Sequence, residues 1–175
     1  MKSITKPQPG EYAPYAVIYI DLIPDDRSIL ERLQAEIESV PEFLRSIPAE
    51  KLAVPCRPGE WTVKEVMSHI MDTERVFAYR ALRFGRNDLT ELFPVDQDLY
   101  VQNSGINQRG LEEIIDEYIS IRKASLSLFE SLSEEALMRT GKVKGNPTSV
   151  RGLIWLTAGH ETHHLNSIKE NYLQG

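Results

Sequence analysis

The hydrophobic positions of this chain fall into four long stretches with helical spacing. In the first, residues 25–47, apolar residues recur at alternating steps of three and four: Leu30, Leu33, Ile37, Val40, Leu44 and Ile47. This spacing predicts an amphipathic helix whose apolar stripe faces a core. Pro41 interrupts the stretch and predicts a kink in the helix.

The other three stretches carry their own start signals or stripes. Thr62, with Glu65 three residues later, is a capping-box signature and predicts a helix over residues 62–84. A heptad-spaced stripe predicts a helix over residues 111–132. The segment GNPTS supplies a proline and a cap at Thr148 or Ser149 for a last helix that ends near residue 172.

Helices of more than 20 residues are about 30 Å long and match one another in a bundle. The sequence therefore predicts an all-α four-helix bundle that occupies residues 1–175 as one domain. The Pro- and Tyr-rich first 24 residues predict an extended arm that closes over the bundle. Residues 85–110 form a connection far longer than a tight turn needs, so we expect it to cross over the bundle and line a site.

Composition narrows the classes of function. The net charge is −6 and the basic residues are scattered, which argues against a nucleic-acid binder. No apolar run approaches the roughly 20 residues of a membrane helix, and the amino-terminal sequence lacks a signal-peptide pattern. With a single cysteine, Cys56, and no export signal, we expect a cytoplasmic protein. Cys56 lies in a Pro-flanked loop far along the chain from the histidines, and only Arg57 beside it is basic, which predicts an ordinary thiol.

All four histidines lie on two of the predicted helices. His160 and His164 are one turn apart and face the core, and His69 lies on the inward row of the helix over residues 62–84. Two such rows can converge on one point. Three imidazole nitrogens suit a divalent ion, most readily Zn²⁺ or Ni²⁺, and leave coordination positions open for water or substrate.

Simpler interpretations compete with this site. A lone buried histidine is more often a hydrogen-bonded core residue than a metal ligand. The pair His160 and His164 alone leaves these two interpretations equal. His69 on a second inward row favours the metal site. His163 is rotated off the metal-facing row and is expected beside the site or in solvent. The segment HETHH also matches the H-E-x-x-H pattern of metalloproteases. Only eleven residues follow His164, and no strand pattern is available to hold a peptide, so we do not favour a peptidase.

Several other residues are candidates for the site. Glu161 is the candidate general base. Asp72 either hydrogen-bonds a liganding imidazole or is an ordinary surface residue. Arg80, on the inward row, either binds an anionic substrate or forms an internal ion pair, because an unpaired buried cation is costly.

Loop and aromatic residues complete the set of candidates. Asp96, Asp98 and Tyr100 in the long connection either touch the site or make turn hydrogen bonds. Trp61 and Trp155 are expected to fill the core.

Three segments carry a resemblance to a known family: GEWTVKEVMSHIMDTERVFAYRALRF, FPVDQDLYV and GNPTSVRGLIWLTAGHETHHL. They closely resemble the DinB-like, YfiT-type superfamily, and the similarity runs across nearly the whole chain. The resemblance implies a four-helix bundle with up-down-down-up connections. It also implies a metal site of one histidine on the second helix and an H-x-x-x-H pair on the fourth, which fall on His69, His160 and His164.

The resemblance also implies a range of activities. Relatives are described as metal-dependent hydrolases, as thiol S-transferases that use low-molecular-weight thiols such as bacillithiol, and as a mycothiol-dependent isomerase. In each, a metal delivers a nucleophile at neutral pH. We expect a small-molecule substrate and slightly favour thiol transfer over hydrolysis, because no general base is secure. A non-catalytic sensor or structural bundle is the alternative, and relatives that pair imply a homodimer.

Overall fold

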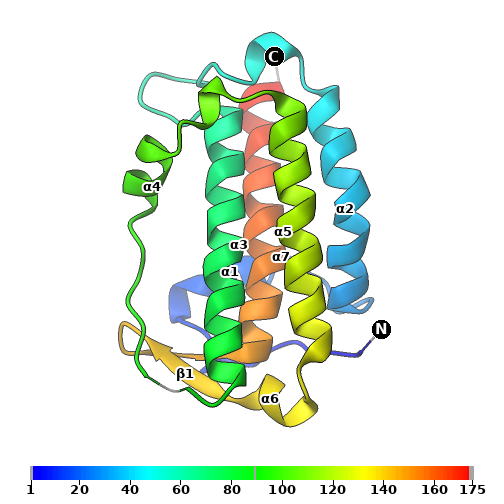
Figure 1. Cartoon of the computed structure of the whole chain (residues 1–175), viewed down its shortest axis with the longest axis vertical. Helices are drawn as coiled ribbons and strands as arrows, with labels where there is room; N and C mark the ends of the chain where they lie inside the picture. The colour runs from blue at the N-terminus through cyan, green and yellow to red at the C-terminus, as the bar shows by residue number, and fades with distance from the viewer. Residues whose placement is uncertain (1, 89, 174–175) are drawn as a thin grey trace.

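The long helices of the chain run side by side along the length of the molecule (Figure 1). The computed structural model describes residues 2–88 and 90–173. The bundle consists of α2 (Ile29–Ser46), α3 (Val63–Gly85), α5 (Leu111–Ser131) and α7 (Val150–Ile168). α3 and α5 run in the same direction, and α2 and α7 run the opposite way (Figure 1). The predicted all-α bundle with up-down-down-up connections is confirmed.

The helix starts follow the predicted signals. The Thr62 side chain accepts from the Glu65 backbone N–H and the Glu65 side chain accepts from the Thr62 N–H, so the capping box of α3 is complete. Ser149 caps α7 by accepting from the backbone N–H of Gly152. α2 starts later than predicted, at Ile29, and the helix continues through Pro41.

The connection between α3 and α5 returns along the full length of the bundle (Figure 1), as predicted. It contains a two-turn helix, α4 (Gln97–Asn103), and a short 3-10 helix, η3 (Ile106–Gln108). The Asp96 side chain caps α4 by accepting from the backbone N–H of Leu99. Because α4 lies beside α3, the connection brings polar loop residues to the side of the bundle that carries His69.

The predicted amino-terminal arm is only partly extended. It contains a 3-10 turn, η1 (Pro14–Ala16), and a single helical turn, α1 (Val17–Ile20), which packs on α7. Gly159 permits this contact: a Cβ atom there would lie 2.3 Å from the backbone oxygen of Tyr19. A helix surface without a side chain therefore lets the arm approach the α7 backbone and fixes Tyr19 in place.

A β-hairpin, which the sequence analysis did not predict, precedes α7. After α6 (Glu134–Met138), strands β1 (Thr140–Val143) and β2 (Asn146–Ser149) pair antiparallel. The two turn residues, Lys144 and Gly145, have φ values of 48° and 77°, and two successive positive φ angles are the signature of a tight hairpin turn. The Leu92 backbone bonds to Lys142 and Lys144 and ties the long connection to this hairpin.

Two hydrophobic clusters, one toward each end of the bundle, form the core. The cluster at the hairpin end includes Trp155, and the cluster at the other end includes Ile168. Between them, each long helix contributes a buried or half-buried polar residue: Glu36, Glu74, Arg122 and Glu161. The bundle also carries the short helices η2 (Ala49–Lys51) and η4 (Lys169–Leu173), the latter a π-helical extension of α7.

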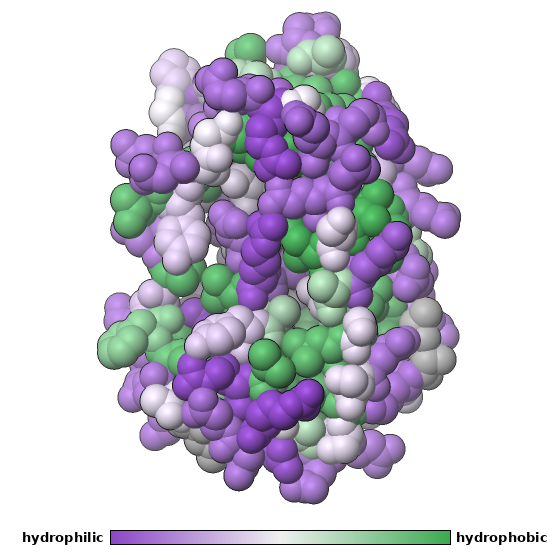
Figure 2. Space-filling view, in the orientation of Figure 1, coloured by the Kyte–Doolittle hydropathy of each residue, from purple (hydrophilic) through white to green (hydrophobic). Residues whose placement is uncertain are grey.

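The surface is mixed in character. Figure 2 shows a face that is largely hydrophilic, with hydrophobic residues grouped in patches between the hydrophilic ones. Large exposed hydrophobic side chains include Tyr79, Phe93 and Leu99. Within the described ranges, no helix combines the length and the apolar character that a bilayer-spanning segment requires.

Candidate metal centre

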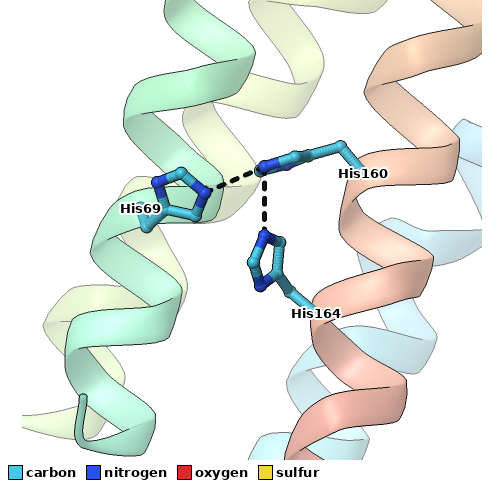
Figure 3. A group of neighbouring side chains, drawn as sticks. All are labelled: His69, His160 and His164. Atoms are coloured by element: carbon cyan, nitrogen blue, oxygen red, sulfur yellow. Dashed lines mark hydrogen bonds between the residues drawn. The ribbon is translucent and has the colours of Figure 1, made fainter. Parts of the chain in front are cut away.

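Three histidine side chains meet between α3 and α7 (Figure 3). The Nε2 atom of His160 lies 2.9 Å from Nε2 of His69 and 3.1 Å from Nε2 of His164. One ring nitrogen of each lies within 4.8 Å of the other two. A single ion held at about 2.1 Å by each nitrogen requires nitrogen separations of about 3.0–3.4 Å, for angles at the ion between octahedral and tetrahedral. The spacings of the His160 nitrogen from those of His69 and His164 fit a shared divalent ion.

Burial favours the neutral form of all three imidazoles. Burial lowers the pKa of His69 to about 4, although the Asp98 carboxylate raises it slightly. Burial, with neighbouring histidines, lowers the pKa of His164 to about 3 and that of His160 well below its usual value. A neutral imidazole keeps the lone pair that a metal ion needs. The donor set is therefore ready to coordinate without first releasing protons.

Aromatic rings surround the trio. The Trp61 ring lies 5.1 Å from the His69 ring, between centroids. The rings of Tyr19 and Phe77 lie 5.5 Å and 6.0 Å from that of His160. His69 and His160 are buried, whereas His164 is half-buried. The trio is therefore closed by aromatic walls on the sides of His69 and His160 and accessible from the side of His164.

On that accessible side, His164 lines a cavity of about 470 Å³. Residues from the loop before α3, from α4 and from the end of α7 form its polar lining: Cys56, Arg57, Glu60, Asp98, His163 and Asn171. Such a volume suits a small molecule. Both signs of charge are present, so the cavity can hold a polar or zwitterionic group beside the three nitrogens.

The structure places Glu161 away from this cavity, which corrects its expected role as general base. Its carboxylate is buried and its Oε2 atom accepts from Arg122 Nη2 at 2.5 Å. Arg122 also pairs with Glu36 and Glu74, at 2.9 Å each. Glu161 belongs to this internal ion-pair cluster, because adjacent positions on a helix point about 100° apart.

Asp72 and Arg80 also lie away from the trio. The Asp72 carboxylate pairs with Arg75 at 3.3 Å and makes no hydrogen bond to a histidine among the described residues. Arg80 follows His69 by eleven residues, about 16 Å along the helix axis. Arg80 forms no ion pair with the residues that the structure describes, so the expectation of an internal ion pair for this arginine is wrong. Instead, Arg80 lines a second cavity.

The loop candidates separate into different environments. Asp98 lines the histidine cavity, Asp96 caps α4, and Tyr100 lines shallow pockets beside α3. Of these three, only Asp98 lines the cavity that His164 opens onto.

Three expectations about single residues are changed or refined. Trp155 is fully buried as expected, whereas Trp61 is half-buried and stands against His69 instead of filling the core. Cys56, treated as distant, lines the histidine cavity. His163 lines the cavity too and contacts Tyr19 edge to face at 5.2 Å. The sequence held a signal for this lining. In the predicted bundle, the loop before α3 must lie at the same end as the last turns of α7, which brings Cys56 toward the histidines.

Comparisons with known proteins agree with this architecture. The sequence model of the DinB superfamily matches residues 30–168. A curated protein of Oceanobacillus iheyensis, named "putative metal-dependent hydrolase", is 27% identical over 150 residues, which cover 84% of this chain and 85% of that protein.

Two solved structures from Bacillus subtilis share the fold. YfiT, described as "a probable metal-dependent hydrolase with an unusual four-helix bundle topology", superposes with a TM-score of 0.69 at 18% identity, covering 85% of this chain and 87% of its own. The DinB-like protein YjoA superposes with a TM-score of 0.58 at 17% identity, covering 83% and 90%.

Proposed function

The chain belongs to the DinB superfamily, and on that premise we propose that it is a metal-dependent enzyme in which His69, His160 and His164 hold one divalent ion. The observation that carries the proposal is the meeting of three imidazole nitrogens beside an accessible cavity. A divalent ion at such a site supplies Lewis acidity, which generates a water or thiol nucleophile at neutral pH. Zn²⁺ and Ni²⁺ are the ions that the all-nitrogen donor set favours.

Hydrolysis of a small ester or amide is the reaction that we propose first. A hydrolase needs a base to accept a proton from the attacking water. Glu161 is engaged by Arg122, but Asp98 offers an exposed carboxylate in the lining of the same cavity as His164. The sequence favoured thiol transfer because it offered no secure general base. Asp98 now supplies a candidate base, so we place hydrolysis first. The names of the relatives YfiT and the Oceanobacillus protein also support a hydrolase.

Thiol transfer is the second candidate, supported by the polar lining of the cavity. Arg57 and Asn171 offer a cation and an amide that can hold the charged groups of a small thiol. This reaction needs no separate base, because coordination itself lowers the pKa of a thiol. A sensor or structural role would follow if neither reaction occurs.

A panel of chromogenic esters and amides, run beside a panel of thiols with an electrophile, tests the two reactions. For a hydrolase, we expect Asp98→Asn to reduce kcat by about 10²–10⁴-fold, the usual contribution of a general base. Asp96→Asn is the matched control, because asparagine also caps a helix and Asp96 lies outside the cavity lining. Conjugation of thiols that survives Asp98→Asn would favour the transferase, and inactivity on both panels would favour the sensor.

We also propose that two chains pair. The arm buries Tyr12 and Ile20 against the bundle but leaves Val17, Ile18 and Leu22 exposed, which is an apolar surface without a partner in the described structure. Burial of such a surface between two chains would stabilise a dimer. Light scattering at micromolar concentration should give about twice the 20.0 kDa mass of the chain, and the monomer mass would contradict pairing.

A further inference from the structure

A second cavity of about 280 Å³ lies toward the hairpin end of the bundle. Aromatic and aliphatic side chains from α1, α3 and α7 form its walls, including Tyr19, Phe77 and Leu156. The hairpin closes it with Lys144 and other residues of the two strands. Its size is at the small end of the range for ligand pockets. It is therefore a small, largely apolar chamber with a polar hairpin at its edge.

The charged groups that line this cavity are all cations. Arg80 and Lys144 contribute to the lining, and none of the described lining residues is acidic. The histidine cavity differs, because its lining contains Asp98 and Glu60 as well as Arg57. A chamber with two cations and no carboxylate has an unbalanced charge that an anion can neutralise.

Arg80 differs from the comparable arginines of the protein. Among the described residues, every other buried or half-buried arginine forms an ion pair with a carboxylate: Arg32, Arg83, Arg109, Arg122, Arg139 and Arg151. Arg80 is half-buried, and within the described part of the chain its Nη2 atom donates only to the backbone oxygen of Phe93, at 3.2 Å. Burial lowers the pKa of Arg80, which reflects a guanidinium partly removed from water without a charged partner. Such a cation is costly unless an anion pairs with it.

We propose that this second cavity binds a small carboxylate with an apolar body, held by Arg80 and Lys144. A guanidinium matches a carboxylate through two parallel hydrogen bonds. The aromatic and aliphatic walls then cover the apolar part of the ligand. Thr148 and Asn146 of the hairpin line the same cavity and offer further polar contacts.

The second cavity is separate from the metal centre but adjoins it. Tyr19 and Phe77 line the cavity, and the same two rings stand 5.5 Å and 6.0 Å from the His160 ring. None of the three histidines lines the second cavity, so the carboxylate site needs no metal.

Calorimetric titration of chelator-treated full-length protein with 2-naphthoate, an aromatic carboxylate, tests the proposal. We expect saturable binding at one site per chain, and weaker binding to the uncharged 2-naphthamide. Arg80→Gln should raise the Kd at least about tenfold, the usual effect of losing a charge-assisted hydrogen bond. Lys144→Gln, at an exposed turn position, should raise it by less. Added salt should weaken binding to the wild type.

Matched controls separate this site from nonspecific attraction and from the metal. Arg86→Gln and Lys142→Gln remove the same charge from exposed positions on the same helix end and hairpin, and they should leave the Kd unchanged. Equal weakening in these controls would overturn the proposal. Binding that requires added Zn²⁺ and ignores Arg80→Gln would also overturn it, since the carboxylate would then bind the metal. Absence of binding by the folded wild-type protein would do the same.

Discussion

Neighbouring positions on α7 face two different polar clusters. His160 points toward His69 and His164, while Glu161 points toward Arg122, Glu36 and Glu74. The Arg122 cluster lies between the two hydrophobic parts of the core. The histidine trio is its neighbour along α7 but contains different chemical groups.

The difference lies in where the positive charge comes from. In the Arg122 cluster the cation is part of the chain: each of its N–H groups has an acceptor, either one of the three glutamates or the Leu33 carbonyl. The histidine trio consists of groups whose neutral form burial favours, and the Nε2 atoms of His69 and His164 lie against Nε2 of His160. A cluster that supplies its own cation fixes the packing of the helices, whereas a set of donors without a cation is suited to receive one.

Removal of Arg122 should have the largest effect on the protein. Arg122→Met leaves buried carboxylates without a counter-charge, and breaking a buried ion pair in this way costs about 3–5 kcal/mol. We expect urea denaturation of chelator-treated protein to show a loss of that order. Arg75→Met, which removes an exposed pair with Asp72 and Glu117, should cost less than about 1 kcal/mol. Equal stability of the two variants would contradict a structural role for the Arg122 cluster.

Removal of a histidine should abolish metal binding but change the stability of the metal-free protein little. Protein purified without chelator or metal-affinity tag should contain about one Zn²⁺ or Ni²⁺ per chain, and His160→Ala should lose it, because two nitrogens on different helices hold an ion weakly. In chelator, the variant should keep most of its unfolding free energy. His163→Ala is the matched control and should retain the metal. Unchanged metal content in His160→Ala by elemental analysis would exclude the proposed centre.

The sequence predicted the histidine trio better than the Arg122 cluster, for a physical reason. His160 and His164 are one turn apart, so helical spacing alone places them on one face. The ion-pair cluster draws one residue from each of four helices, and its partners depend on the register and rotation of helices that sequence spacing does not define. Arg122 nevertheless gave a signal: it lies four residues after Tyr118, on the apolar stripe of α5.

The elements outside the long helices were harder to predict. Helix periodicity and the capping box identified the bundle, but the hairpin before α7 consists of two four-residue strands. Its turn signal is the Lys144–Gly145 pair, which is weaker than the Asn-Gly and Asp-Gly pairs that dominate such turns. The cavity lining was missed because Cys56 and Trp61 lie in a loop, whose position depends on tertiary contacts.

The pH dependence of stability should sharpen the contrast between the clusters. Burial lowers the pKa of His69 to about 4, below the usual 6.5 of an exposed histidine. Between these values the unfolded chain binds a proton that the folded protein does not, so stability falls as the pH is lowered. From pH 6.5 to 5, His69 should contribute a loss of about 2 kcal/mol.

The measurement is the difference in unfolding free energy between chelator-treated wild type and His69→Ala. Burial raises the pKa of Glu161, which gives stability a slope of opposite sign above pH 4.5. Both proteins share that contribution, so it cancels in the difference. The variant should lack the loss on acidification that His69 causes. Parallel profiles for the two proteins would show that His69 is not kept neutral by burial.

The smallest expected effect is a spectroscopic difference between the two tryptophans. Trp61 stands 5.1 Å from the His69 ring, whereas Trp155 is buried in the hydrophobic cluster at the hairpin end and donates to the backbone oxygen of Ile4. A paramagnetic ion such as Ni²⁺ quenches nearby fluorophores most strongly, so its addition to chelator-treated protein should quench Trp61 more than Trp155. Titration of Trp155→Phe should retain most of the quenching with a stoichiometry of one ion, and Trp61→Phe should lose most of it. Because His160→Ala leaves both tryptophans in place, loss of saturable quenching in that variant would tie the signal to the trio, and quenching that persists there would place the ion elsewhere.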